Sequence, residues 1–257
     1  MGASSTKSSA NCSGPEPRRT VTIRAVLFDW GGTIVRDDSM VATSPTAAVA
    51  HYARQTLHLA LRDEAFDRAF QEVLPPPMPA ASRGAPSIAA LIGAAFQHLG
   101  WKIDDSHVAD CAQLFFAEAT FAHDVFDDAR ALLPLLKSRG YRMAVVTNSL
   151  FPSAMLTPWF GELGLAGYFD AVISSADVGR TKPDLEPYIA ALRALAIDPH
   201  EALFVGDRIQ TDIAGARAAG LRAVLIDRSG RRREGAGYLV IKHLSGLDEF
   251  LGEDAIQ

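Results

Sequence analysis

Cysteine is scarce in this sequence. Its 257 residues include two cysteines, Cys12 in a polar N-terminal stretch and Cys111 in a predicted amphipathic helix. Two isolated thiols provide neither a disulfide framework nor the paired spacing of a metal site. The seven histidines also lack paired metal-ligand spacing, such as two histidines on one helix face around a glutamate. We therefore expect neither a disulfide-stabilised fold nor a metal site built from cysteine or histidine.

Long apolar runs and an excess of positive charge are absent as well. No uninterrupted apolar stretch reaches the roughly 20 residues needed to cross a bilayer, and the first 20 residues lack the apolar core of a signal peptide. The net charge of -5 and the pI of about 5.8 offer no basic footprint for a nucleic acid or an acidic membrane. We expect a cytoplasmic monomer or homodimer that acts on a small soluble molecule, with no nucleic-acid or membrane partner.

Apolar runs of strand length are present, and helical patterns separate them. With 48% hydrophobic residues the chain can bury a sizeable core. Helical patterns over 128–140, 183–196 and 212–220 alternate with the strand-like runs, which predicts a doubly wound, Rossmann-like parallel α/β sheet covered on both faces. The predicted strands are 21–28, 143–147, 171–174, 202–206 and 223–227.

The remaining segments predict the domain organisation. Residues 1–20 have almost nothing to bury, so we expect a disordered N-terminal tail. The α/β core is predicted to comprise 21–36 and 126–257, and 37–125 to form a helical insert. Within this insert we expect a helix from Ser44 through Leu59, a loop over 74–86, and helices over 87–99 and 106–121.

Polar residues follow the predicted strands at four places. Asp29 and a Gly-Gly pair follow the first strand, and Thr147-Asn148 end the second. Lys182 lies in a Gly-Arg-Thr-Lys-Pro-Asp segment after the third strand, and Asp207 and Asp212 follow the fourth. Ligands of open parallel sheets bind beyond the carboxyl ends of the strands. The four segments should therefore converge on one crevice.

These four segments, in this order, resemble the four motifs of the haloacid dehalogenase-like superfamily, and the resemblance covers nearly the whole chain beyond the tail. It implies a phosphohydrolase with a C1-type helical cap, in which Asp29 attacks phosphorus and forms an aspartyl-phosphate. Thr147 would hydrogen-bond the transferring phosphoryl group, and Lys182 would neutralise its charge and orient Asp29. Gly32 and Asn148 would contribute to phosphate binding.

The resemblance also implies a Mg²⁺ site. Its ligands would be Asp29, the backbone carbonyl of Gly31, Asp207 and Asp212, since Mg²⁺ prefers hard oxygen ligands. A carboxylate cannot approach a phosphate dianion unless cations screen the repulsion, and Mg²⁺ together with Lys182 would supply them. Two alternatives stay open, because Lys182 could be a solvated charge before a helix and Asp212 an N-cap.

Gly31 departs from the family pattern, in which phosphatases usually carry a second Asp two residues after the nucleophile. A positioned acid/base is worth about 10²- to 10⁴-fold in rate. The protein could be a phosphatase that is slow or uses another acid, such as Asp37, Asp38 or a substrate hydroxyl. It could instead hydrolyse a C–P bond like phosphonoacetaldehyde hydrolase, for which Lys102 is the one lysine of the insert. Or it could bind a phosphorylated ligand or a protein without catalysis.

Retention of the acidic pair and the lysine favours the phosphatase. Dehalogenase chemistry is the least favoured, because it needs no metal and would not use Asp207 with Asp212. A helical cap leaves limited space above the sheet, so the expected substrate is a small phosphorylated metabolite. We expect Trp30, next to the nucleophile, to pack beneath the insert.

Overall fold

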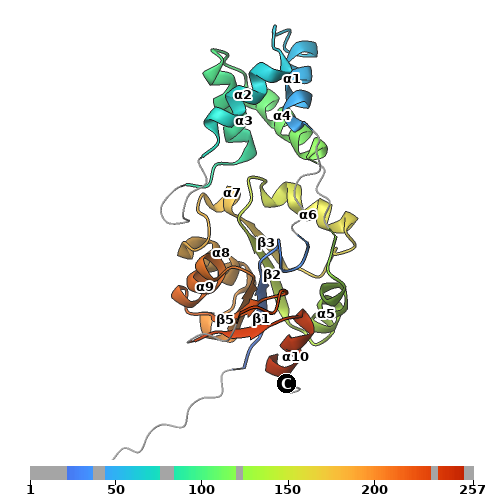
Figure 1. Ribbon diagram of the computed structural model, residues 1–257, viewed down its shortest axis with the longest axis vertical. Helices are drawn as coiled ribbons and strands as arrows, with labels where there is room; N and C mark the ends of the chain where they lie inside the picture. Colours follow the sequence, from blue (N-terminus) through green and yellow to red (C-terminus); the bar gives the residue numbers. More distant parts are fainter. Residues whose placement is uncertain (1–21, 37–43, 76–83, 120–123, 233–236, 252–257) are drawn as a thin grey trace, which may run out of the picture.

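A computed structural model shows a six-stranded, fully parallel sheet with helices on both faces (Figure 1). It describes residues 22–36, 44–75, 84–119, 124–232 and 237–251. The strand order is β3-β2-β1-β4-β5-β6. The strands are β1 (Ala25–Phe28), β2 (Arg142–Thr147), β3 (Ala171–Ser174), β4 (Ala202–Gly206), β5 (Arg222–Ile226) and β6 (Leu239–Ile241). The predicted α/β fold class is confirmed, and the chain reverses its direction of winding between β1 and β4.

Alternate residues of the central strand face two separate cores. Val26 and Phe28 pack with α5 (Asp127–Ser138) and α6 (Ser153–Glu162), on the face that also carries α10 (Asp248–Leu251). Ala25 and Leu27 pack on the other face with α8 (Leu185–Leu195) and α9 (Ala214–Ala218). Because side chains alternate along a strand, a short apolar run buries both faces of the sheet at once.

Several short elements link the strands and helices. They are α7 (Ser175–Val178), the 3-10 turns η1 (Pro199–Glu201) and η3 (Leu244–Leu247), and the π-helical turn η2 (Ile209–Ile213) that leads into α9. The predicted helix over 212–220 therefore begins earlier, as a π turn. None of the helices in the described ranges is long and apolar enough to cross a membrane.

Four helices occupy the described part of the chain between β1 and α5, and they lie beyond the carboxyl ends of the strands (Figure 1). They are α1 (Pro45–Gln55), α2 (Asp63–Val73), α3 (Ile88–His98) and α4 (Asp105–Glu118). The predictions for α1, α3 and α4 are confirmed, although α1 ends four residues before Leu59. The prediction missed α2. Its buried side chains, Phe66, Ala69 and Phe70, follow helical spacing within a strongly charged segment.

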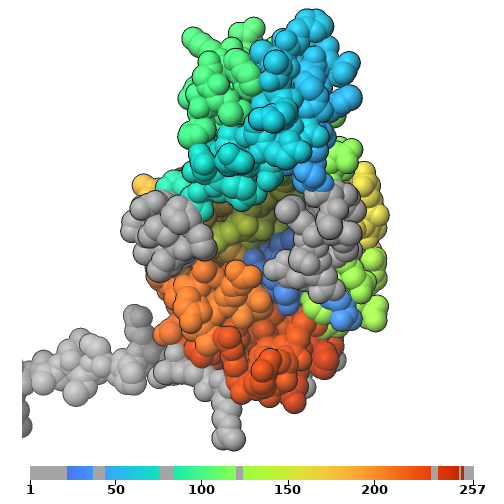
Figure 2. Space-filling model, turned by 45° about the horizontal axis from the view of Figure 1, so that its top comes forward, coloured from blue at the N-terminus to red at the C-terminus, as the bar shows by residue number. Residues whose placement is uncertain are grey.

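The insert contacts the loops that follow β2 and β3. The N–H of Ile88 donates to the carbonyl of Leu150 at 2.7 Å, and that of Ala85 donates to Gly179 at 2.9 Å. The rings of Phe116 and Phe151 meet edge to face, with 4.9 Å between centroids. In the space-filling view the surface is hollowed between the insert helices and the core (Figure 2). The insert therefore stands over the edge of the sheet at which the polar segments gather.

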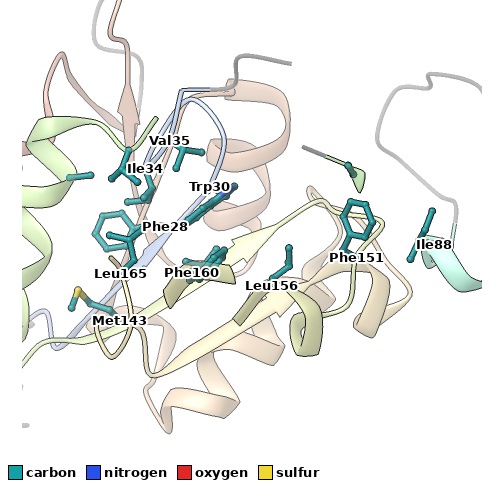
Figure 3. Close-up of a cluster of buried hydrophobic side chains, with 14 of the residues drawn as sticks. Phe28, Trp30, Ile34, Val35, Ile88, Met143, Phe151, Leu156, Phe160 and Leu165 are labelled. Atoms are coloured by element: carbon teal, nitrogen blue, oxygen red, sulfur yellow. The ribbon is translucent and has the colours of Figure 1, made fainter. Parts of the chain in front are cut away.

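The N-terminal tail, 1–20, lies outside the described residues, and so does most of the predicted loop, 76–83. Trp30 is buried, and its ring stacks on Phe160 of α6 at 4.0 Å between centroids (Figure 3). It also meets the ring of Trp159 at 5.7 Å, and Trp159 in turn meets Phe116 of α4 at 6.4 Å. Trp30 therefore packs against α6, which contacts the insert.

Candidate active site

The carboxyl ends of β1 and β4 place two carboxylates side by side. Phe28 pairs with Val205 in the register of these strands, and the N–H of Asp29 donates to the Val205 carbonyl at 2.8 Å. Asp207 follows β4 by one residue. Both side chains therefore lie where the winding of the sheet reverses, which is where open parallel sheets bind their ligands.

Lys182 reaches this point from the segment before α8. Its Nζ lies 2.5 Å from Oδ1 of Asp29 and 2.8 Å from Oδ1 of Asp212, and its side chain is 2% exposed. The ammonium group also lies 5.4 Å from the centroid of the Phe204 ring. Since a buried charge requires partners, Lys182 is not the solvated charge of the alternative interpretation.

The peptide of Lys182 is held by Asn148. The Lys182 N–H donates to Oδ1 of Asn148 at 2.8 Å, and Nδ2 of Asn148 donates to the Lys182 carbonyl at 3.1 Å. Thr147, which pairs with Ser174 across β2 and β3, ends its strand in a buried position beside this contact. The amide of Asn148 thus connects the second and third predicted motifs.

Asp212 is anchored from two sides. It lies inside the π-helical turn, where Oδ2 accepts the N–H of Arg208 at 2.9 Å and Oδ1 accepts the Lys182 ammonium. The residue that precedes the turn is Arg208, so Asp212 is not the N-cap of the alternative interpretation. Its side chain is 1% exposed and turns toward Asp29.

Burial controls the charges in this cluster. It raises the pKa of Asp29 from 3.8 to about 7, and the nearby Asp212 and Asp207 add to this rise while Lys182 opposes it. Burial also raises the pKa of Asp207, with a further contribution from Asp212. For Lys182, burial acts to lower the pKa, but the carboxylates of Asp29 and Asp212 outweigh it and raise the value. The site holds more negative than positive charge and favours a cation.

The carboxylates fit a divalent metal ion. Asp29, Asp207 and Asp212 each offer one ligand atom, and these three atoms lie within 4.8 Å of one another. Among the described residues, Oδ1 of Asp207 is buried without a hydrogen-bond partner, and Nε of Arg208 lies 3.9 Å from it. A cation bound here would relieve the cost of burying this oxygen. Hard oxygen donors of this kind suit Mg²⁺.

Two glycines allow the carboxylates to come this close to the backbone. A Cβ at Gly32 would lie 2.5 Å from Oδ2 of Asp207, and the residue has a φ of 72° that disfavours other residues. A Cβ at Gly206 would lie 2.5 Å from Cβ of Asp212. The glycines following β1 and ending β4 are therefore required by the site and not only by the turns.

The comparisons with known proteins agree with this geometry. A model of the haloacid dehalogenase-like hydrolases matches residues 23–220. The chain belongs to this family. It is 39% identical to a phosphoserine phosphatase of Thermus thermophilus over 46% of the chain and 47% of that protein. It is 28% identical to a glyceraldehyde 3-phosphate phosphatase of Methanopyrus kandleri over 80% of the chain and 84% of that protein.

Two solved structures share the fold. A 2-haloacid dehalogenase of Pseudomonas syringae pv. Tomato DC3000 has a TM-score of 0.65 at 24% identity, with 90% of this chain and 98% of that chain covered. A haloacid dehalogenase-like phosphatase of Thermococcus onnurineus has a TM-score of 0.60 at 25% identity, with 91% and 100% covered. The chain spans about half the length of the first curated relatives it matches, 47% and 58%.

In this haloacid dehalogenase-like hydrolase, sequence reasoning overlooked a pair of charged residues beside the loop after β1. Arg228, which follows β5, and Asp128, in the first turn of α5, form a two-pronged ion pair at 2.9 and 3.1 Å. A cavity of about 620 Å³ beside them is lined by Gly32, Asp207 and Arg228 among others. The one sequence signal was the position of Arg228 just beyond a strand, the same signal that pointed to Asp29.

Of Lys102, Asp37 and Asp38, the residues considered for other chemistry, the structure describes Lys102. Lys102 is exposed and lines a groove between α3 and α4 whose lining residues all belong to the insert. Asp37 and Asp38, considered as substitute acids, lie outside the described residues. The position of Lys102 in this groove favours a phosphatase over chemistry that needs a lysine of the insert at the active site.

Proposed function

We propose that this protein is a Mg²⁺-dependent phosphatase that hydrolyses a small phosphorylated metabolite through an aspartyl-phosphate on Asp29. The observation that carries this proposal is the contact of the Lys182 ammonium with both Asp29 and Asp212, with Asp207 in the same cluster. A buried cation beside three carboxylates at the strand ends suits the attack of one carboxylate on an anionic phosphorus centre.

Asp29 is the proposed nucleophile. One of its oxygens forms a bond to phosphorus while the bond from phosphorus to the leaving oxygen breaks, and the leaving oxygen takes the electron pair. Lys182 keeps Asp29 oriented and offsets the negative charge that gathers at the phosphoryl group. The Thr147 hydroxyl and the backbone at Asn148 and Gly32 are proposed to bind the phosphoryl oxygens.

The proposed metal ligands are Asp29, the Gly31 carbonyl, Asp207 and Asp212. Bound Mg²⁺ would neutralise the phosphoryl group and allow a carboxylate to approach it. Asp212 already accepts hydrogen bonds from Lys182 and from the backbone of Arg208. We propose that part of its contribution to the metal site is to hold these two neighbours, and with them the other ligands, in position.

Gly31 leaves the leaving oxygen without the usual proton donor. We propose that the substrate's own hydroxyl or a residue near the entry to the insert supplies this proton, at a lower rate than a positioned carboxyl would. Loss of a positioned acid/base costs about 10²- to 10⁴-fold. Hydrolysis of the aspartyl-phosphate should be slower as well, because the Asp that family phosphatases carry at this position also activates the attacking water.

Helices α1–α4 are proposed to form a C1-type cap domain over 37–125, with the core formed by 21–36 and 126–257. Their contacts with the loops after β2 and β3 support this assignment, because these loops lie at the same strand ends as the carboxylate cluster. A cap in this position limits the size of the substrate, which fits a small metabolite. The names of the relatives, a phosphoserine phosphatase and a glyceraldehyde 3-phosphate phosphatase, point to the same substrate class.

A panel of phosphorylated metabolites and one aryl phosphate, assayed with Mg²⁺ for release of inorganic phosphate, tests the proposal. We expect release that stops when Mg²⁺ is chelated. Asp29→Asn should reduce it by on the order of 10³-fold or more, whereas Asp248→Asn, which alters an exposed aspartate of α10, should not. Folded protein that releases no phosphate from any compound of the panel would refute the proposal.

A further inference from the structure

Arg228 donates hydrogen bonds directly to the backbone of the nucleophile loop. Its Nη2 lies 2.7 Å from the carbonyl oxygen of Thr33, and its Nε lies 3.2 Å from that of Gly32. The same guanidinium holds both oxygens of Asp128 and stacks on the Phe126 ring at 3.4 Å. A side chain on the loop after β5 thus binds the backbone of the loop after β1 at two consecutive residues.

Asp128 is a fixed counter-ion for this arginine. Its Oδ2 also accepts the N–H of Leu244 at 2.8 Å, and its side chain is 15% exposed. Burial alone would raise its pKa, but hydrogen bonds from Arg228 and from the Leu244 backbone outweigh this effect and lower the value. The pair therefore joins four segments, namely the loop after β1, the start of α5, the end of β5 and the start of η3.

The donors of Arg228 are nearly all in use. A guanidinium has five N–H groups. One on Nε, one on Nη1 and two on Nη2 account for the four bonds to Gly32, Thr33 and Asp128. Two-pronged recognition of a substrate anion uses two parallel free donors, and Arg228 has one N–H left, on Nη1. Its geometry therefore suits the support of the loop and not the capture of a phosphate.

The two carbonyls that Arg228 binds, those of Gly32 and Thr33, directly follow the segment that carries the proposed nucleophile and the proposed metal ligand Gly31. Gly31, whose carbonyl is a proposed metal ligand, immediately precedes Gly32. Gly32 itself packs against Oδ2 of Asp207, and its N–H donates to the Val35 carbonyl at 2.8 Å. A shift at Gly32 would move the Gly31 carbonyl, Asp207 and the Asp29 backbone together.

We propose that Arg228 is a positioning residue, which with Asp128 holds the loop over 31–33 in the geometry that Asp29 and the Gly31 carbonyl require. This inference deepens the proposed function and rests on it for its catalytic consequence. The structural part does not depend on catalysis and can be measured on protein without metal or substrate.

The experiment compares Arg228→Met, Arg228→Lys and Asp128→Asn with Arg139→Met. Arg139 forms a surface pair with Asp248 at 2.7 Å from the end of α5 and serves as the matched control. The first measurement is amide hydrogen exchange of the segment over 31–35 in metal-free protein. We expect about tenfold faster exchange in Arg228→Met, because removal of hydrogen bonds to a charged group costs about one power of ten or more. Arg228→Lys should retain part of the protection, since one ammonium cannot reproduce the fork.

The second measurement is the Mg²⁺ dissociation constant by calorimetry, again without substrate. Loss of a group that orients a metal ligand typically weakens binding by 10- to 100-fold. We expect this range for Arg228→Met, a smaller effect for Asp128→Asn, and no change for Arg139→Met. Phosphate release should fall in the same order, and added Mg²⁺ should recover part of it in Arg228→Lys.

The outcomes separate the two proposals. Unchanged exchange over 31–35 in folded Arg228→Met, or an equal increase in Arg139→Met, would overturn the positioning role. If Arg228→Met does not fold, Asp128→Asn carries the same test, because its amide keeps an acceptor for the Leu244 N–H but loses the charge that holds Arg228. If the wild type releases no phosphate while exchange and Mg²⁺ binding respond as expected, the phosphatase fails and the loop support stands.

Discussion

The carboxyl group of Asp29 lies where its negative charge is unfavourable. It is buried next to Asp207 and Asp212, and one ammonium group cannot balance three negative charges. The pKa of Asp29 therefore rises from 3.8 to about 7 in the folded protein. Between these pH values the folded state keeps a proton that the unfolded chain has lost, so the stability of the metal-free protein falls as pH rises through this window.

Replacing the Asp29 carboxyl by an amide should remove this loss of stability at high pH. In the presence of a chelator, we expect Asp29→Asn to unfold at a higher temperature than the wild type at pH 8, with a difference that shrinks as the pH approaches 4. Calorimetric melting temperatures of both proteins across this range provide the measurement. Mg²⁺ should narrow the difference at pH 8 by stabilising the wild type. A constant difference at all pH values would show that burial of Asp29 does not have the predicted cost.

Gly31 is the residue at which the site departs from related phosphatases. We expect Gly31→Asp to hydrolyse the best substrate of the panel at least tenfold faster, because a positioned carboxyl contributes about 10²- to 10⁴-fold. The steady-state rate at saturating Mg²⁺ is the measurement. A slower variant would instead mean that the site is built around the missing carboxyl.

At the scale of elements, the turn after β1 and the turn after β4 fit together at the contact of Gly32 with Asp207. The contact is too tight for any side chain at position 32. The π-helical turn has a related function, since it brings Asp212 under Gly206 and toward Lys182. Irregular backbone thus accounts for the distances within the carboxylate cluster.

A pair of glycine substitutions tests this contact. Gly32 and Gly100 both have positive φ, 72° and 83°, but a Cβ at Gly100 would meet no atom within 4 Å. Gly32→Ala and Gly100→Ala should each lose about 1–2 kcal/mol in the free energy of unfolding from the strained backbone. Only Gly32→Ala should also weaken Mg²⁺ binding, because it displaces Asp207. Denaturant unfolding and calorimetry measure the two effects, and equal Mg²⁺ affinity in both variants would contradict this role of Gly32.

Elements with a clear apolar pattern could be predicted from the sequence, and those without one could not. Five strands rich in β-branched residues were predicted, whereas β6 has three residues and depends on pairing with β5. In α6, Pro158 and Gly161 interrupt the helical signal, and the helix is stabilised by packing of Trp159 and Phe160 against Trp30. Both β6 and α6 therefore depend on tertiary contacts that the local sequence pattern does not show.

At the scale of the whole molecule, the order of the motifs was enough to predict that Asp29, Lys182, Asp207 and Asp212 would meet, and the structure brings them together. Parallel strands in this topology leave few other places for residues that follow them. The roles of these residues stay predictions. Arg228 could not be predicted, because its partner Asp128 lies 100 residues away and no local pattern links them.

The proposed reaction transfers a phosphoryl group onto Asp29. Because Gly31 provides no carboxyl to activate water, the aspartyl-phosphate should decay slowly. It should accumulate during turnover with a substrate whose own hydroxyl supplies the proton for its formation. The direct measurement is mass spectrometry of peptides from protein quenched in acid during hydrolysis with Mg²⁺. We predict that the peptide containing Asp29 gains the mass of one phosphoryl group, and that this gain is absent in Asp29→Asn. Phosphate release that continues in Asp29→Asn, or a phosphoryl group found on another residue, would contradict the account.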